Sequence, residues 1–193
     1  LRGDVEFRID NGFLTGAEFN DSPNSDERPE NEEPQLIVIH CISLPPGEFG
    51  GLDIHRLFTN QLDFNADPFF SRLSELKVSA HFLIDRSGEV TQFVSCLRRA
   101  WHAGSSEWKG RSNCNDYSIG IELEGIDTEV FDPRQYESLR KLCRALVACY
   151  PIEGMAGHSH IAKPSGRKKD PGQGFNWAEL SNFRNLELPV SLR

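Results

Sequence analysis

The sequence QLIVIHCI at residues 35–42 decides the fold. Apolar residues, several of them β-branched, fill it, and His40 is its one titratable side chain apart from Cys41. A short run of this kind is typical of a central strand that is buried on both faces. The next residues, SLPPGEFGG at 43–51, hold two prolines and three glycines and therefore predict a loop. Asp53 then predicts a helix N-cap for LDIHRLFTN at 52–60.

Further along the chain, strand-like and helix-like patterns alternate. Residues 78–84 and 89–94 flank DRSG and predict a hairpin, and YSIGIEL at 117–123 predicts another buried strand. Residues 133–150 start with a proline and carry an apolar stripe at helical spacing. We expect a long loop at 154–174 and a short helix at 176–183. The alternation predicts an α/β domain with a mixed sheet.

The 193 residues fit one globular domain. Residues 18–34, EFNDSPNSDERPENEEP, are acidic and polar and predict a surface arm without a packed element. We therefore divide the chain into an acidic, partly irregular arm at 1–34, a domain at 35–183 and a tail at 184–193.

Composition excludes several classes of partner. The formal net charge of −8 argues against binding to nucleic acid. The first residues contain no apolar stretch long enough for a signal peptide, and no window of the chain is apolar enough for a membrane helix, so we expect a cytoplasmic protein without membrane insertion. Nothing indicates a protein partner. The cysteines are odd in number and form no CxxC pair, which is typical of reduced thiols; they are Cys41, Cys96, Cys114, Cys143 and Cys149.

Histidines occur where they can serve a metal or simply fill the core. His40 ends an apolar strand, and both interpretations stay open for it. GHSHIAKPSGRKKDPG at 157–172 holds His158, His160 and Asp170, which suit zinc, although a solvated basic loop would look the same. Trp101 and His102 sit in AWHAG, where the indole is either a platform for a sugar ring or part of the core.

Glu122 and Glu124 share one face of the strand at 117–123, because side chains alternate along a strand. A carboxylate on a buried strand is costly unless it is paired or lies in a cleft. In a dry cleft its pKa would rise toward neutrality, as a general base requires. The alternative is a pair of ordinary ion-paired residues facing solvent.

Together these segments resemble the zinc-dependent N-acetylmuramoyl-L-alanine amidases, the amidase_2 or peptidoglycan-recognition-like family, and most closely its cytoplasmic AmpD-type branch, which acts on 1,6-anhydro-muropeptides. The resemblance covers roughly residues 11–183. Its motifs are VIHCISLPPGEFGG, LKVSAHFLIDRSGEV, RRAWHAG, CNDYSIGIELEGIDT, AGHSHIA and RKKDPG.

The resemblance implies a central mixed β-sheet flanked by helices and one catalytic zinc ion. The zinc ligands would be His40, His158 and Asp170. Glu122 would activate the attacking water and Lys168 would stabilise the oxyanion. The substrate would be a muropeptide, cut at the amide between the muramic-acid lactyl group and L-alanine for peptidoglycan recycling.

Three positions depart from the family pattern: Cys41, commonly Asn; Lys77, often Arg; and Asn113, often Arg. We expect these residues, with Trp101 and His102, to contact substrate. Two alternatives remain. A non-catalytic muropeptide-binding module could share the fold, and a cysteine amidase could use Cys41, although adjacent residues of a strand point to opposite faces and His40 would reach that thiol poorly.

Overall fold

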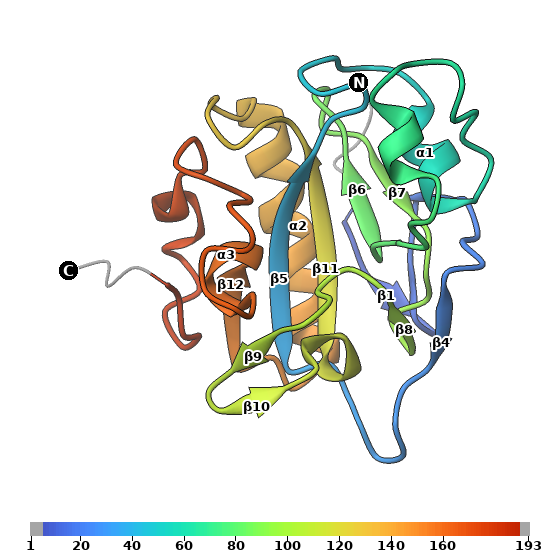
Figure 1. Ribbon diagram of the computed structural model, residues 1–193. Coiled ribbons are helices and arrows are strands. Elements are labelled where there is room, and N and C mark those ends of the chain that lie inside the picture. The colour runs from blue at the N-terminus through green and yellow to red at the C-terminus, as the bar shows by residue number, and fades with distance from the viewer. Residues whose placement is uncertain (1–5, 190–193) are drawn as a thin grey trace.

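The computed structural model describes residues 6–189, and Figure 1 shows its arrangement. The first five residues of the predicted arm and the last four of the predicted tail lie outside the described residues. Within 6–189, none of the helices has the length and apolar character needed to cross a bilayer.

A six-stranded mixed sheet forms the centre of the protein (Figure 1). β12, β5, β11 and β6 run parallel, β7 is antiparallel to β6, and β3 runs parallel to β7. This confirms the predicted α/β fold with a mixed sheet. In spatial order the strands are β12 (Gly154–Gly157), β5 (Leu36–Ile42), β11 (Ser118–Glu124), β6 (Phe82–Ile84), β7 (Val90–Gln92) and β3 (Glu18–Phe19).

Short elements surround this sheet. Three antiparallel pairs are β1 (Ile9–Asp10) with β2 (Phe13–Leu14), β4 (Ser25–Glu27) with β8 (Arg98–Ala100), and β9 (Glu107–Trp108) with β10 (Arg111–Ser112). The helices are α1 (Asp53–Phe58), α2 (Pro133–Cys149) and α3 (His158–Ile161), with 3-10 turns η1 (Phe70–Leu73), η2 (Cys114–Tyr117) and η3 (Trp177–Leu180).

The alternation of side chains along β5 and β11 separates two apolar layers. Ile37 and Ile39 of β5 join Ile119 and Ile121 of β11 in the core that α2 covers. Leu36 and Val38, with the opposite parity, pack in a separate cluster with Ala156 and Ile161 near α3. His40 and Glu122 share this second parity, so both side chains lie on the face of the sheet opposite α2.

α2 is the longest helix and its start follows the predicted chemistry. The Asp132 carboxylate accepts from the N–H of Arg134, and the Gln135 side chain accepts from the N–H of Asp132. Pro133 occupies the first turn, where its missing N–H costs no hydrogen bond. The predicted helix at 133–150 is therefore confirmed to within one residue.

Several predicted boundaries need correction. Asp53 is the first residue of α1 rather than its cap; Leu52 precedes the helix, and the Asp53 carboxylate pairs with Arg56. The stretch at 154–174 was expected to be loop throughout, but it begins with β12 and α3. The last predicted helix is only a single 3-10 turn, η3.

The expectation that residues 18–34 contain no packed element is wrong. β3 extends the main sheet and β4 pairs with β8. Ser22 and Asn24 are buried, and the Ser22 hydroxyl donates to the Phe58 carbonyl. Backbone pairing and side-chain hydrogen bonds hold this segment, which is why its polar composition did not reveal it.

Candidate active site

Three side chains from distant parts of the sequence converge at the carboxyl end of β5. His40 Nδ1 lies 3.1 Å from His158 Nδ1 and 3.0 Å from Asp170 Oδ2. His158 Nδ1 lies 3.1 Å from the same Asp170 oxygen. The three atoms thus form a nearly equilateral triangle. The structure brings together the three candidate metal ligands that the family resemblance implied.

The donor set fits a divalent cation. Ligand bonds of about 2.0–2.1 Å at tetrahedral angles separate neighbouring ligand atoms by about 3.3 Å, close to the spacing found here. Burial lowers the pKa of His40 to about 4, so the ring is neutral and can offer a lone pair. Burial opposes ionisation of Asp170, but its close contacts with His158 and His40 outweigh burial, and the pKa of this carboxyl is lowered.

The outer nitrogen of His158 fixes the tautomer of that ring. His158 Nε2 lies 3.0 Å from the Ala103 carbonyl oxygen, which can only accept a hydrogen bond. Nε2 therefore holds the ring proton, and the lone pair of Nδ1 points into the triangle that this atom forms with His40 Nδ1 and Asp170 Oδ2. The Ser159 N–H donates to the Asp170 carbonyl over 2.9 Å and keeps the two ends of the 158–170 segment together.

His102 supports His40 in the same way. His102 Nδ1 lies 2.9 Å from His40 Nε2, and His102 Nε2 lies 3.2 Å from the Ser118 hydroxyl. When His40 Nε2–H donates to His102, Nδ1 of His40 is left with a lone pair for the metal. A Cβ on Gly120 would lie 2.5 Å from the His102 ring, so glycine is needed there for the ring to lie against β11.

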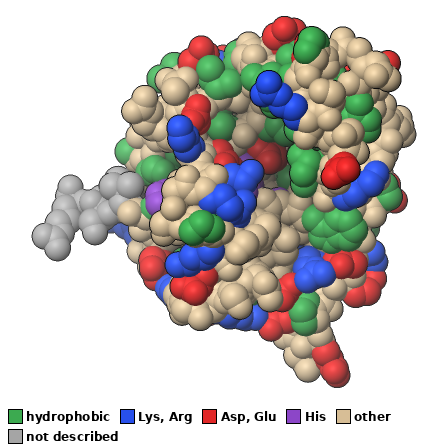
Figure 2. All heavy atoms as spheres, in the orientation of Figure 1, with side chains coloured by type: hydrophobic (Ala, Val, Ile, Leu, Met, Phe, Trp, Pro, Cys, Tyr) green, Lys and Arg blue, Asp and Glu red, His purple; other side chains and the backbone are tan. Residues whose placement is uncertain are grey.

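A cleft of about 420 Å³ opens beside these residues. Figure 2 shows a hollow on this face, with acidic and histidine side chains at its base and basic side chains on its rim. Apolar side chains form one wall, among them Leu44, Phe58, Phe69, Leu73 and Val78. The predicted residues that line the cleft are His40, Cys41, Trp101, His102, Glu122, His158, Lys168 and Asp170.

Glu122 lies beside the candidate metal ligands and carries a buried, unpartnered carboxyl oxygen. It pairs in register with His40 across the parallel strands β11 and β5, and it is only 9% exposed. Its Oε2 is buried and has no hydrogen-bond partner among the described residues. Burial, and then the negative charge of Asp170, raise the pKa of Glu122 well above its usual value, whereas Lys168 opposes the rise. An unpartnered buried carboxyl of this kind is typical of a general base.

The structure distinguishes Glu122 from Glu124, and the candidate metal ligands from His160. Glu124 accepts hydrogen bonds from the N–H groups of Gly50 and Arg86, over 2.6 and 3.1 Å, and so ties two loops to β11. His160 Nδ1 accepts from the Gly157 N–H, and its ring packs against Trp177. Neither residue lines the cleft, so both serve the fold.

Two of the expected substrate-contacting residues lie elsewhere. Lys77 is exposed and is not a lining residue, although its neighbours Leu76 and Val78 line the cleft. Asn113 is exposed, has a positive φ of 57°, and precedes η2 outside the cleft. His102 does line the cleft, but both of its ring nitrogens are engaged by His40 and Ser118.

Other contributors were missed from the sequence. Ser79 and Asp127 line the cleft, and Ser118 and Gly120 hold His102. A signal existed for the last two, because they share the strand parity of Glu122. No pattern pointed to Ser79 or Asp127, which reach the cleft through the packing of segments far apart in sequence.

The family model for N-acetylmuramoyl-L-alanine amidase, Amidase_2, matches residues 30–173. The chain belongs to this family. The 1,6-anhydro-N-acetylmuramyl-L-alanine amidase AmpD of Escherichia coli is 52% identical over 89% of this chain and 94% of that protein. This amidase also matches a crystal structure of a selenomethionine AmpD derivative, with a TM-score of 0.87, 50% identity, and coverage of 90% and 97% of the two chains.

A more distant structure holds a ligand. The amidase AmiD of E. coli, in complex with anhydro-N-acetylmuramic acid-L-Ala-D-gamma-Glu-L-Lys, is 25% identical to this amidase at a TM-score of 0.59. The match covers 98% of this chain and 70% of that one. The protein is therefore an amidase of the predicted family, with the predicted fold.

Proposed function

We propose that this amidase hydrolyses the amide between the lactyl group of 1,6-anhydro-N-acetylmuramic acid and L-alanine in muropeptides, during peptidoglycan recycling. The observation that carries the proposal is the convergence of His40, His158 and Asp170 beside the unpartnered carboxyl of Glu122. The name of the E. coli relative supports the anhydro substrate, and the AmiD complex shows that a related fold accommodates such a ligand.

We infer that the resident metal is one zinc ion held by His40, His158 and Asp170. Two imidazole nitrogens and one carboxylate oxygen form a donor set that zinc favours, and three protein ligands leave a position open for catalysis. When bound, the ion supplies Lewis-acid polarisation of the scissile carbonyl. His102 and the Ala103 carbonyl keep the two imidazoles oriented.

Proton transfer falls to Glu122. Burial raises the pKa of Glu122, so the carboxyl group binds a proton more readily than a solvent-exposed glutamate does. It accepts the proton of the attacking water and returns it to the departing nitrogen of L-alanine. Lys168 lines the same cleft, and its ammonium offsets the negative charge that develops on the carbonyl oxygen.

Substrate recognition uses the remaining walls of the cleft. Trp101 offers an indole to the sugar ring, and Cys41 lies on the lining beside the metal ligands. Lys168 and Lys169 place two positive charges near the carboxylates of the stem peptide. The contribution of Lys77 and Asn113 to substrate binding stays a prediction.

The cysteine mechanism has little support. Burial, and then the charge of Glu122, raise the pKa of the Cys41 thiol far above its usual value, so the thiolate is disfavoured. His40 directs its nitrogens to His158, Asp170 and His102. We further propose a reducing, cytoplasmic setting, which the five free cysteines support.

Elemental analysis and product identification test the proposal together. We expect one zinc per chain and release of a stem peptide with N-terminal L-alanine from an anhydro-muropeptide, detected by mass spectrometry. A chelator should abolish cleavage and zinc should restore it. Cleavage that persists without metal would refute the zinc mechanism, and tight binding without any cleavage would favour a non-catalytic muropeptide-binding module.

A further inference from the structure

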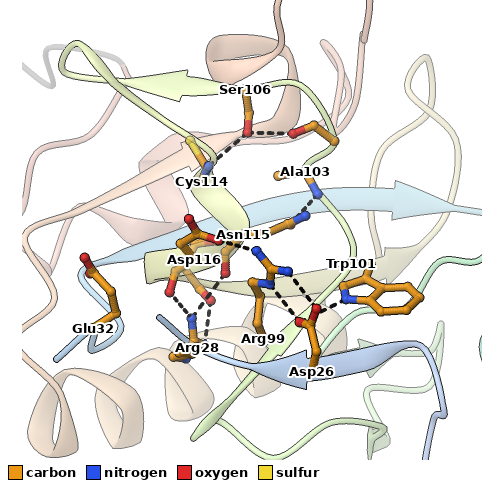
Figure 3. Close-up of polar contacts among 12 residues, drawn as sticks. Asp26, Arg28, Glu32, Arg99, Trp101, Ala103, Ser106, Cys114, Asn115 and Asp116 are labelled. Carbon is orange, nitrogen blue, oxygen red and sulfur yellow. Dashed lines mark hydrogen bonds and ion pairs between the residues drawn. The ribbon is translucent and has the colours of Figure 1, made fainter. Parts of the chain in front are cut away.

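A charged network links the N-terminal segment to one wall of the cleft (Figure 3). Asp26 of β4 lies in register with Arg99 of β8. Arg99 Nε and Nη2 donate to the two Asp26 oxygens over 2.7 and 2.6 Å. Arg99 Nη1 donates to Asp116 Oδ1 over 2.5 Å. Paired donors of this type fix the plane of the carboxylate, so Asp26 has one well-defined orientation.

The Asp26 carboxylate has a third partner. Trp101 Nε1 donates to Asp26 Oδ1 over 3.2 Å, and Figure 3 shows the indole N–H directed at this carboxylate. Trp101 lines the cleft and is only partly buried. Asp26 does not line the cleft, so it contacts the indole from outside the cleft.

The backbone of Trp101 is also fixed. Its N–H donates to the Ser79 hydroxyl over 3.0 Å, and its carbonyl accepts from the Ser79 N–H over 3.1 Å. With the backbone held, the remaining freedom of this residue is rotation about its side-chain bonds. The hydrogen bond to Asp26 selects one rotamer, because a turned indole would lose its N–H partner.

Arg99 keeps Asp26 in its accepting form. The hydrogen bond from Arg99 is the largest influence on Asp26; burial opposes it, and the net effect lowers the pKa of this carboxyl. A Trp–Asp contact is not needed to neutralise Arg99, which already has Asp26 and Asp116 as partners. The contact with Trp101 is thus an additional feature of the network.

We propose that Asp26 is a positioning residue for substrate, which acts by holding the Trp101 indole so that its ring lies against the sugar of the muropeptide. The inference rests on the proposed function for the identity of the sugar. A pyranose has an apolar C–H face that stacks on an aromatic ring, and a ring fixed in advance binds it with a smaller entropy cost. Asp26 itself touches neither the sugar nor the reacting atoms.

A double-mutant cycle on the zinc-loaded, full-length enzyme tests this role. Asp26→Ala should raise KM for an anhydro-muropeptide about tenfold and change kcat less than about twofold. The reason is that the variant weakens the binding of the substrate and of the transition state equally. Trp101→Phe, which keeps a ring but has no N–H, should raise KM as well. In the Trp101→Phe background, Asp26→Ala should raise KM no further. Equal KM ratios in both backgrounds would refute the proposal.

Glu27→Gln is the matched control. Glu27 is the next residue of β4, pairs with Arg98 and is highly exposed, so the variant should keep wild-type KM and kcat. Should Asp26→Ala fail to fold, Asp26→Asn takes its place in the cycle. An asparagine carbonyl still accepts a hydrogen bond from the indole, so the rise in KM should be smaller than for Asp26→Ala. If Glu27→Gln raised KM as much as the Asp26 variant does, the assignment would be contradicted.

Fluorescence tests positioning without turnover. Replacing Trp108 and Trp177 by Phe leaves Trp101 as the sole tryptophan. In this background Asp26→Ala should increase acrylamide quenching and lower the anisotropy of Trp101, and unchanged values would overturn the proposal. Failure of the wild type to cleave would refute the proposed function alone. Cleavage with unchanged KM in Asp26→Ala would refute only the role of Asp26.

Discussion

His102 Nδ1 lies 2.9 Å from His40 Nε2, so the buried imidazole of His102 orients the imidazole of His40 in the candidate metal site. The second nitrogen of His102 lies within hydrogen-bond distance of the Ser118 hydroxyl, and the three residues form a chain from β11 to the candidate metal site. We expect that replacing His102 by Phe lowers zinc affinity about 10- to 100-fold, since partners of this kind set ligand orientation. Competition with a chromogenic chelator measures the change.

His160→Gln is the control for that experiment. The ring of His160 contacts Trp177 and the Gly157 N–H, away from the cleft. Zinc stoichiometry and affinity should match the wild type. A loss of zinc in this variant, with retention in His102→Phe, would mean that the ligand set is assigned wrongly.

Glu122→Gln should retain the metal and lose turnover. The amide has nearly the shape of the carboxyl group but cannot take up a proton, so kcat should fall about 10²- to 10⁴-fold. Steady-state cleavage of an anhydro-muropeptide, with zinc content measured on the same sample, checks the result. Glu124→Gln should keep most of its turnover per folded molecule, because Glu124 serves backbone N–H groups rather than the cleft.

Acid should destabilise the metal-free protein. Burial lowers the pKa of His40 to about 4 and of His81 to about 3, and lowers that of His102 strongly. In the unfolded chain these rings become protonated below about pH 6.5. Their contribution to the free energy of unfolding is therefore fully present above that pH and is lost progressively as the pH drops. In this range each ring adds about 1.4 kcal/mol per pH unit to the slope of the free energy of unfolding against pH.

Urea titrations at pH 7, 6 and 5 in chelator measure this slope. The Glu122→Gln background is preferable, because the raised pKa of Glu122 means that the folded state binds this proton more tightly than the unfolded chain does, which opposes the effect of the histidines. His81→Gln removes one of the titrating rings, so the slope should fall by the amount that corresponds to roughly one proton. A free energy of unfolding that stays constant from pH 7 to 5 would contradict the prediction.

Arg28→Met should lower the free energy of unfolding by about 2–5 kcal/mol. The Arg28 guanidinium donates to four backbone carbonyls over 2.8–3.2 Å, and methionine would leave these acceptors without that partner; they belong to Cys96, Asn115, Asp116 and Ser118. Urea unfolding at pH 7 measures the change in the free energy of unfolding. Arg8→Met, at an exposed side chain, should change stability by less than about 0.5 kcal/mol, and equal losses would argue against the role of Arg28.

The sequence predicted the elements whose local pattern is strong. β5 and β11 are continuous apolar runs, and α2 has a proline start and an apolar stripe, so each was located within a residue or two. β3, β4 and β12 were missed, because two to four residues of backbone pairing leave no period in the side chains. Their existence depends on which strands happen to lie beside them.

The candidate site was predictable to a similar degree. The sequence pointed to His40, His158, Asp170 and Glu122 because their residue types carry chemistry and their family motifs are specific, and the structure places all four in one cleft. The role of His102 depends on where its ring points, and the role of Asp26 depends on the pairing of β4 with β8. Neither orientation nor pairing is written in the local sequence, so both required the structure.

The parallel register that sets His40 opposite Glu122 has a consequence for how such an enzyme can evolve. The separation of the two groups is set by the hydrogen-bonded ladder between neighbouring strands, not by any loop. Substitutions on the surrounding loops can therefore reshape which muropeptide is admitted while leaving the reaction centre untouched. A slip of one residue between β5 and β11 would turn one of the two groups toward α2, so a change in this strand alignment is far more damaging than a change in the cleft walls.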